Sequence, residues 1–275
     1  MNPITIDHLT KRYAGFTLDD VSLTIPTGYI TGFVGANGAG KTTTIKAALG
    51  MVRPDSGSVT TWDKARIGVV LDTPPFNPQW RIGDMTKALA AFYPVWSGDV
   101  LAEQLDRGGI RADHMVKDLS RGMGMRLQMG LALAHAPDLL ILDEPTSGLD
   151  PLGRSELRDD LAEFITDERH AVWFSTHITS DLERLADNLV IISRGRIIAD
   201  GPLDEVRAGF VKAQGTPDQL TSHLRRIAHG LVETAVGWEA LVTTNDATQL
   251  SASIVCSEPT IEEIVVAVAK EAHHD

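Results

Sequence analysis

The pattern of hydrophobic and polar residues divides the first part of the chain into short strands and one helix. Apolar and β-branched residues alternate or cluster in short segments, and turn residues such as Gly15, Pro26 and Gly28 separate them. A glycine-rich loop leads into a predicted helix over residues 41–49. The predicted strands span residues 4–9, 16–25, 29–35, 59–62 and 66–71.

The middle of the chain is first helical and then alternates strands with helices. Residues 82–111 are predicted to be helical, with Met85, Leu89 and Phe92 on one face. The later predicted elements are helices near 127–134, 152–165 and 180–186 and strands at 139–143, 171–176 and 188–193. This alternation predicts an α/β fold with a mainly parallel sheet. The N-terminal strands, which lack intervening helices, predict a small antiparallel β subdomain beside it.

The pattern weakens after about residue 205 into a smaller unit. Its clearest part is the last helix, on which Ile261, Ile264, Val265 and Val268 form an apolar stripe that must pack against another element. We therefore predict a small C-terminal α+β accessory region over residues 206–275.

Composition and charge narrow the functional classes. The formal net charge is −12, which argues against a protein that mainly grips nucleic acid, because such binding needs clustered Lys and Arg. Cys256 is the only cysteine, so no intrachain disulfide and no cysteine-rich metal site can form. No signal core is visible, and no apolar run approaches the roughly 18 residues that span a bilayer. We expect any membrane role to depend on a partner.

The segment GANGAGKT, residues 35–42, follows a predicted strand and opens a helix. That context is what a phosphate-binding loop requires, and the alternative is a chance glycine-rich turn. Gly38 and Gly40 let successive N–H groups point into one concavity. Lys41 is expected to contact the β- and γ-phosphates, and Thr42 offers a hydroxyl to Mg²⁺.

Two further strands end in candidate catalytic residues. LLILDEP places Asp143 and Glu144 at the end of a buried strand, where ligands bind in open α/β sheets. We expect Asp143 to hold Mg²⁺ and Glu144 to orient or deprotonate the attacking water, although such a pair can also cap the next helix. FSTHI places His177 near the γ-phosphate; the alternative is a surface histidine.

The segment DLSRGMGMRL, residues 118–127, predicts a second phosphate site. Ser120 is a good N-cap, and Gly122 and Gly124 leave backbone N–H groups of the first helical turn open to an anion. One chain needs only one phosphate site for one nucleotide. The second site therefore raises the question of whose phosphate it binds.

Together these motifs resemble those of the ATP-binding cassette (ABC) ATPases. GANGAGKT, LSRGMGMRL, LLILDEP, SGLD and FSTH occur in the order and approximate spacing of the Walker A, signature, Walker B, D-loop and H-loop segments. The resemblance covers residues 1–205. It implies a P-loop NTPase core with a helical signature subdomain at about residues 73–135. The SRGM signature and the C-terminal PTIEEIVVAVAK are similar to bacterial exporter-type (ABC-2-like) subunits, which pair with separate membrane proteins.

The resemblance also implies residue roles, with ATP and Mg²⁺ as ligands. Lys41, Glu144 and His177 are the implied catalytic residues, and Thr42, Asp72 and Asp143 the implied metal ligands. The implied nucleotide contacts are Tyr13, Gly35, Asn37, Gly38, Ala39, Gly40, Lys41, Thr42, Thr43, Ser120, Gly122 and Asp150. Tyr13 matches the aromatic that stacks on adenine, with ordinary packing as the alternative. Asp150 matches a residue that communicates between nucleotide sites, and before Pro151 it is also a good N-cap.

Two segments depart from the family pattern, at three positions. Asp72 stands where the family usually has the Gln that touches Mg²⁺ and water and senses the membrane subunit; a carboxylate can still bind Mg²⁺ but is shorter and charged. Arg121 and Met123 stand where many members have Gly and Gln. Ser120 and Gly122, which make the most direct phosphate contacts in the family, are present.

The leading hypothesis is an ATP-hydrolysing transporter subunit on the cytoplasmic face of the membrane. It would pair with a like or similar ATPase subunit around two ATP molecules and drive a separate transmembrane permease. The alternatives are a soluble ABC ATPase acting on ribosomes or DNA, and a degenerate cassette of low activity. Phe76 and Trp80 are candidate permease contacts or core residues. The C-terminal region is expected to adjust dimer contacts, and His273, His274 and Asp275 to form a tail rather than a metal site.

Overall fold

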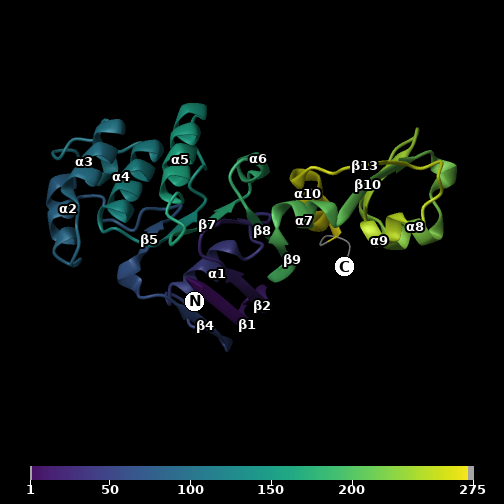
Figure 1. Cartoon of the computed structure of the whole chain (residues 1–275), viewed down its shortest axis with the longest axis horizontal. Coiled ribbons are helices and arrows are strands. Elements are labelled where there is room, and N and C mark those ends of the chain that lie inside the picture. The colour runs from purple at the N-terminus through teal and green to yellow at the C-terminus, as the bar shows by residue number, and fades with distance from the viewer. Residues whose placement is uncertain (1, 272–275) are drawn as a thin grey trace.

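A six-stranded sheet forms the centre of the molecule (Figure 1), in a computed structural model that describes residues 2–271. All neighbouring strands run parallel except the last pair, β8 and β9, which are antiparallel. The three neighbouring strands β6, β7 and β3 are buried along their whole length. In order across the sheet the strands are β5 (Ile67–Val70), β6 (Leu139–Asp143), β7 (Ala171–Thr176), β3 (Ile30–Val34), β8 (Asn188–Ser193) and β9 (Arg196–Pro202).

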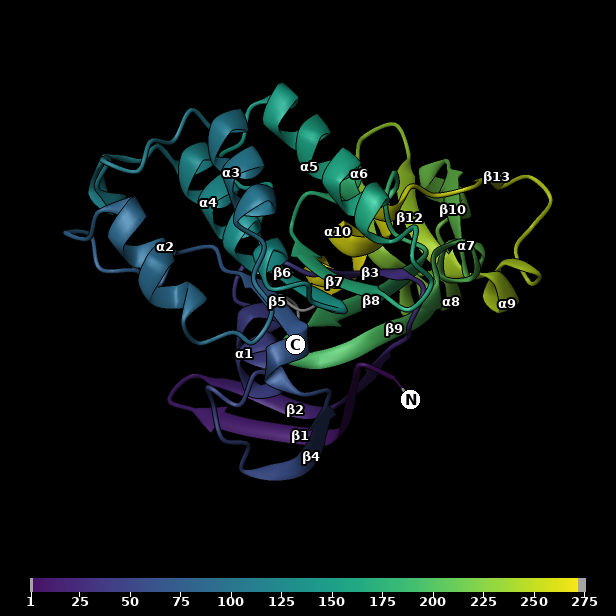
Figure 2. The same cartoon turned by 60° about the vertical axis from the view of Figure 1, so that its left-hand side comes forward.

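A small antiparallel sheet lies below the central sheet (Figure 2). Its strands, in the order β2, β1, β4, are Phe16–Ile25, Ile4–Tyr13 and Ser56–Thr61. The two sheets enclose helix α1 (Lys41–Ala48), and Ile45 of this helix is fully buried in a shared apolar core with Leu18 and Phe33. The predicted combination of a mainly parallel sheet and an antiparallel subdomain is confirmed.

Three helices form a separate layer at one end of the molecule (Figures 1 and 2). They are α2 (Ile82–Ala90), α3 (Gly98–Arg107) and α4 (Arg121–Ala134), and they pack around their own apolar core. The prediction of continuous helix over 82–111 is wrong between α2 and α3. Pro94 lies in the break and cannot donate a helical hydrogen bond, and the Ser97 side chain caps α3 by accepting from the N–H of Val100 at 3.3 Å.

A buried ionic cluster joins this helical layer to helix α5 (Pro151–Phe164), which follows the strand β6. Arg126 on α4 is 4% exposed and forms an ion pair with Asp160 on α5. Arg107 on α3 also binds Asp160, at 2.7 Å, and Gln104 accepts from Arg126 at 3.1 Å. Removing one member of such a buried pair costs about 3–5 kcal/mol, so the helical layer is held firmly against α5.

The C-terminal region forms a second antiparallel sheet at the other end of the elongated molecule (Figure 1). The strand order is β11, β12, β10, β13. The strands are β10 (Phe210–Gly215), β11 (His229–Glu233), β12 (Trp238–Thr243) and β13 (Val255–Ser257). The remaining helices are α6 (Thr179–Leu182), α7 (Leu203–Ala208), α8 (Ser222–Ile227), α9 (Thr244–Ala247) and α10 (Ile261–Glu271), with 3₁₀ turns at Lys64–Arg66, Val116–Asp118 and Pro217–Gln219.

Helix α10 attaches the C-terminal region to the central sheet. Ile261 and Ile264 are fully buried and share a core with residues of β7 and β8 such as Phe174. Burying one such side chain stabilises by about 1.5–3 kcal/mol. Thr260 and Glu263 cap the start of the helix reciprocally, at 3.1 and 2.9 Å. The predicted apolar stripe therefore has its partner, which is the central sheet itself.

Candidate functional site

The loop before α1 has the shape that the GANGAGKT segment predicts. Gly38 and Gly40 have φ angles of 80° and 118°, a region that glycine reaches without strain. A Cβ on Gly40 would lie 2.6 Å from Cδ2 of Leu18 and 3.0 Å from the ring of Phe16. Glycine is therefore required at position 40 both by conformation and by space.

Lys41 begins α1 and points back over this loop. Its side chain is 5% exposed, and its Nζ donates to the carbonyl oxygen of Gly35 at 2.7 Å. The same nitrogen lies 3.1 Å from Oε1 of Glu144. Of the neighbouring predicted contacts, Asn37 and Thr42 are exposed, whereas Thr43 is half-buried. The loop therefore presents one nearly buried cation beneath an accessible rim.

The register of β6 against β7 builds the acidic part of the site. Asp143 ends β6 directly beside Ser175 on β7, and the Ser175 hydroxyl donates to Oδ1 of Asp143 at 2.6 Å. The N–H of Glu144 donates to the carbonyl oxygen of Ser175 at 3.0 Å. Sequence reasoning missed Ser175, although its place two residues before His177 in the FSTH segment was an available signal. This serine orients both carboxylate residues.

Glu144 turns out of the strand with a φ of 52°, a conformation that few non-glycine residues adopt. That turn carries its carboxylate between two groups from other elements. Oε1 faces Lys41, and Oε2 lies 2.7 Å from Nδ1 of His177. The structure thus brings all three predicted catalytic residues together, from the start of α1 and from the carboxyl ends of β6 and β7.

The start of α4 forms a second, more exposed helix terminus. The Ser120 side chain accepts from the N–H of Met123 at 3.2 Å, which confirms its predicted role as N-cap. Ser120 is exposed and Gly122 half-buried. Within residues 2–271, no hydrogen bond or ion pair links Ser120 or Gly122 to the loop that holds Lys41. This terminus is therefore not closed against its own phosphate loop.

Asp72, predicted as a metal ligand, has a different partner in this structure. Its carboxylate forms an ion pair with the guanidinium of Arg121, the first residue of α4. A cavity of about 280 Å³ lies beneath this pair, and its lining also includes Ser120, Glu144 and Ser147. Asp72 therefore lines the same cavity as Glu144 but is paired with the first residue of α4.

Gln128 fixes the segment that leads to Asp72. Its side-chain amide accepts from the N–H of Leu71 and donates to the carbonyl oxygen of Leu71, both at 3.0 Å. These two bonds imitate a strand pairing at the open end of β5. Sequence reasoning missed Gln128 because it is an ordinary helical residue whose partner lies in a distant segment.

Two other predicted contacts lie at the surface. The Tyr13 side chain is 45% exposed, with Nζ of Lys11 5.8 Å from its ring centroid, so the packing alternative does not describe it. Asp150 accepts from the N–H of Gly153 at 2.7 Å, which confirms its N-cap role for α5.

A largely apolar hollow lies between the helical layer and the central sheet. Its volume is about 380 Å³, and Phe76, Tyr93, Trp96 and Leu131 contribute to its lining. Phe76 also packs against the helical core, whereas Trp80 is 48% exposed. The hollow thus offers a binding surface between two structural layers.

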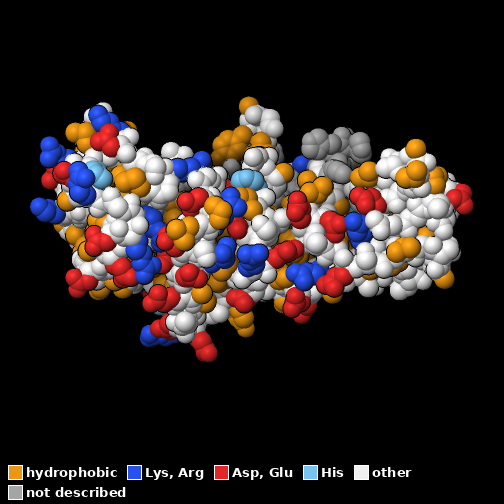
Figure 3. All heavy atoms as spheres, turned by 90° about the horizontal axis from the view of Figure 1, so that it is seen from above, with side chains coloured by type: hydrophobic (Ala, Val, Ile, Leu, Met, Phe, Trp, Pro, Cys, Tyr) orange, Lys and Arg blue, Asp and Glu red, His pale blue; other side chains and the backbone are white. Residues whose placement is uncertain are grey.

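The remaining predicted features are a basic segment and the C-terminal residues. On the face drawn in Figure 3, basic and acidic side chains are interspersed rather than gathered by sign. Arg225 of the basic HLRRIAHG segment is paired with Glu233. The terminal His273, His274 and Asp275 lie outside the described residues. Across residues 2–271, no cluster of three or more His, Cys, Asp or Glu has a metal-binding arrangement, and no helix is long and apolar enough to cross a membrane.

Comparison with known proteins explains this combination of loop, strand ends and second helix terminus. Residues 18–147 match the family model described as ABC transporter. Over 211 residues the chain is 36% identical to the lantibiotic transport ATP-binding protein SrtF of Streptococcus pyogenes, covering 73% of this chain and 91% of that protein. The chain belongs to the ABC transporter family. The predicted resemblance is therefore confirmed.

Another relative and a solved structure support the same family assignment. The bacitracin transport ATP-binding protein BcrA of Bacillus licheniformis is 33% identical over 212 residues, which cover 72% of this chain and 69% of that protein. A solved structure described as the ATP-binding subunit of an ABC transporter superposes with a TM-score of 0.67 at 26% identity, covering 74% of this chain and 91% of that one. The ABC subunit thus binds nucleotide and hydrolyses ATP in the service of transport, as predicted.

Proposed function

We propose that two ABC ATPase subunits, either two copies of this chain or one copy and a similar partner, enclose two ATP molecules between them. The observation that carries this proposal is the separation of the two phosphate-binding helix termini. The loop before α1 is served by Lys41, whereas Ser120 and Gly122 at the start of α4 have no hydrogen bond or ion pair to that loop among residues 2–271. A second subunit, arranged head to tail, would bring its ATP to the open terminus.

The nucleotide contacts follow from the exposed groups around the first loop. Tyr13 would stack on adenine, since its ring is exposed and aromatic stacking on a base stabilises. The loop N–H groups and Lys41 would hold the β- and γ-phosphates. The contact set we propose for the first site is Tyr13, Gly35, Asn37, Gly38, Ala39, Gly40, Lys41, Thr42 and Thr43. Ser120, Gly122 and Asp150 would belong to the site of the partner's ATP.

The residues at the strand ends fit a magnesium ion. Mg²⁺ is usually held by one or two protein oxygens together with waters and phosphates rather than by a protein cage. Thr42 offers an exposed hydroxyl, and Asp143 a carboxylate that Ser175 orients at 2.6 Å. When bound, the ion would neutralise charge on the transferred phosphoryl group. Asp72 would join these ligands only after leaving Arg121.

Glu144 is proposed to accept the proton of the attacking water. In the subunit alone its two oxygens face Lys41 at 3.1 Å and His177 at 2.7 Å. An arriving γ-phosphate would draw Lys41 away from the carboxylate, because the phosphate carries more charge. Glu144 would then be available as a base, and His177 would keep the carboxylate oriented while facing the γ-phosphate. Binding of substrate and activation of the base are linked through one lysine.

A separate transmembrane permease is the proposed mechanical partner, with this subunit on the cytoplasmic face of the membrane. The names of relatives such as SrtF and BcrA, which are transport ATP-binding proteins, support this assignment. The apolar hollow beside Phe76 would accept a short segment of the permease, and the exposed Trp80 would extend the contact. Motion of the helical layer would then be transmitted to the membrane protein.

The proposed domain division follows from these roles. Residues 1–205 would form the ATPase domain, with residues 73–135 as its helical subdomain. Residues 206–275 would form an accessory region that adjusts dimer contacts. The boundary lies within α7 (Leu203–Ala208), whose Leu203 and Val206 are buried in the same core as α10. The accessory region would therefore respond to movements of the central sheet through this shared core.

The sandwich dimer is tested by comparing Glu144→Gln with the double variant Ser120→Arg/Glu144→Gln. Glu144→Gln prevents turnover and should form a dimer when ATP and Mg²⁺ are added, measured by light scattering after size exclusion. Ser120→Arg places a bulky side chain at the open helix terminus. It should leave ATP binding to the monomer within about twofold and abolish the dimer. An S120R/E144Q protein that still dimerises with ATP would refute the proposed arrangement.

A further inference from the structure

Arg121 lies between two segments that approach the active site. Its guanidinium pairs with Asp72 in the segment after β5, and its stem rests on Gly148 in the loop after β6. A Cβ on Gly148 would lie 2.6 Å from Cδ of Arg121, and Gly148 has a φ of 76°. The arginine therefore occupies space that only a glycine at position 148 leaves open. Both departures from the family pattern meet in this one contact.

The same face of α4 holds the segment after β5 at a second point. Gln128, about two turns further along the helix, makes two hydrogen bonds of 3.0 Å with the backbone of Leu71. Between these points, a Cβ on Gly124 would be in ordinary contact with Cγ of Pro74, at 3.7 Å. Gln128 thus provides a fixed, partly buried attachment, and the Asp72–Arg121 pair forms the exposed end.

The charge of Arg121 favours an exchange of partners. Arg121 is the first residue of α4, where the helix dipole disfavours a cation, and no acidic residue lies in the first turn. Asp72 supplies the neutralising charge from another segment. The side chains of Arg121 and Asp72 are 50% and 46% exposed, and ion pairs with such exposure contribute little to stability. A phosphate offers more charge and a bidentate geometry to arginine.

We propose that Arg121 is a substrate-binding residue that changes partner during the ATP cycle. Within one subunit it binds Asp72. When the subunits close, it binds the γ-phosphate of the ATP held by the partner, beside Ser120 and Gly122. Asp72 is thereby released toward the magnesium and phosphate of its own subunit. This inference rests on the proposed sandwich dimer. The exchange of partners would link the state of each ATP site to the occupancy of the other.

The test measures the ATP concentration that gives half-maximal dimerisation in the Glu144→Gln background. Arg121→Gln should raise this concentration about tenfold or more, because hydrogen bonds to charged groups are the strong ones. Asp72→Asn should lower it by about two- to fivefold, because a competitor for Arg121 is removed. The double variant should behave like Arg121→Gln, and Arg121→Lys should show a smaller shift than Arg121→Gln.

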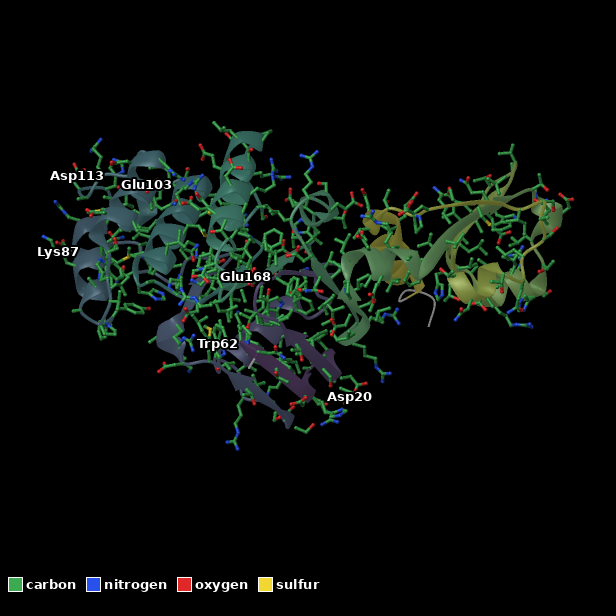
Figure 4. The ribbon with its side chains drawn as sticks, viewed as in Figure 1. Asp20, Trp62, Lys87, Glu103, Asp113 and Glu168 are labelled. Atoms are coloured by element: carbon green, nitrogen blue, oxygen red, sulfur yellow. The ribbon has the colours of Figure 1, made fainter. Side chains whose placement is uncertain are left out.

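A matched control removes another exposed arginine–carboxylate pair from the same helical layer. Arg111 pairs with Asp113 at 2.9 Å, and Figure 4 shows Asp113 at the outer edge of the molecule. Arg111→Gln should leave dimerisation unchanged. Shifts of the same sign for Arg121→Gln and Asp72→Asn, or no shift for either, would identify the pair as a static link and overturn the exchange. Failure of the parent Glu144→Gln protein to dimerise would instead overturn the sandwich itself, so the two failures are distinguishable.

Discussion

The two helix termini that we propose as phosphate sites differ in the groups that surround them. The terminus of α1 carries a nearly buried Lys41 with a carboxylate and a carbonyl oxygen as partners within hydrogen-bonding distance. The terminus of α4 carries an exposed Arg121 whose carboxylate partner comes from a segment 49 residues away. One site is built by a strand, a loop and the neighbouring strand ends of the same sheet. The other is the exposed edge of a separate helical layer.

This difference fits the proposed reaction between two subunits. A buried cation and carboxylate exchange partners only when a strong ligand enters, because leaving either group unpaired is costly. An exposed pair breaks easily and so responds to a partner that arrives at the surface. The first terminus is therefore suited to chemistry, and the second to detecting the other subunit.

The largest effect is expected from a substitution that disables the first site alone. Glu144→Gln should reduce ATP turnover by about a thousandfold or more, because a positioned general base contributes roughly 10²–10⁴. Nucleotide affinity, measured with a fluorescent ATP analogue, should change little, and the dimer should become more stable. Unchanged turnover in this variant would exclude Glu144 as the base. Such a result would also remove the chemical contrast between the two termini.

Lys41→Met should have the next largest effect. Loss of the buried cation should weaken ATP binding by about 10- to 100-fold, the range expected for hydrogen bonds to charged groups. Equilibrium binding of the fluorescent analogue provides the measurement. Arg121→Gln serves as the matched comparison, because it removes the cation of the second terminus and should not weaken binding to the monomer. Equal losses of monomer affinity in the two variants would contradict the division of roles.

Trp80→Ala tests whether the segment that pairs with the second terminus also contacts the proposed permease. Trp80 is 48% exposed at the end of the segment that begins with Asp72. Removing a central interface aromatic should weaken binding to the permease about tenfold. Phe92→Ala is the control, since Phe92 is 81% exposed on the same helical layer but outside that segment. Recovery of the co-purified permease in detergent measures both variants, and equal recovery would argue that Trp80 is not a contact.

Asp72→Gln, which restores the usual family residue, should give the smallest effect. ATP affinity of the monomer should stay within about twofold, because the carboxylate is half-exposed and weakly coupled. Stimulation of turnover by the permease should change by about threefold, since the segment that carries residue 72 connects the site to the helical layer. Comparison of ATPase rates with and without the permease tests this. A large loss of affinity with normal stimulation would contradict it.

Local patterns predicted a large part of the fold. The central strands, the antiparallel subdomain and the helix starts at Ser120 and Asp150 follow from residue periodicity and from capping groups that act within three residues. The helix over 82–111 was predicted too long, because its apolar period outweighed Pro94 and Ser97 in the sequence reasoning. The strands of the C-terminal region were not individually predicted, because their alternation is weak and their pairing brings distant segments together.

The candidate site also has features that the sequence predicts and features that only the structure reveals. The sequence by itself determined the order of the motifs and the candidate residues Lys41, Asp143, Glu144 and His177, because motif order and residue type are local properties. Only the tertiary structure decided that Ser175 orients Asp143 and that Arg121 takes Asp72 as its partner. These pairs join groups 32 and 49 residues apart. Their contacts depend on strand register and on how the helical layer packs against the sheet. Neither of these can be predicted from the residues next to each other in the sequence.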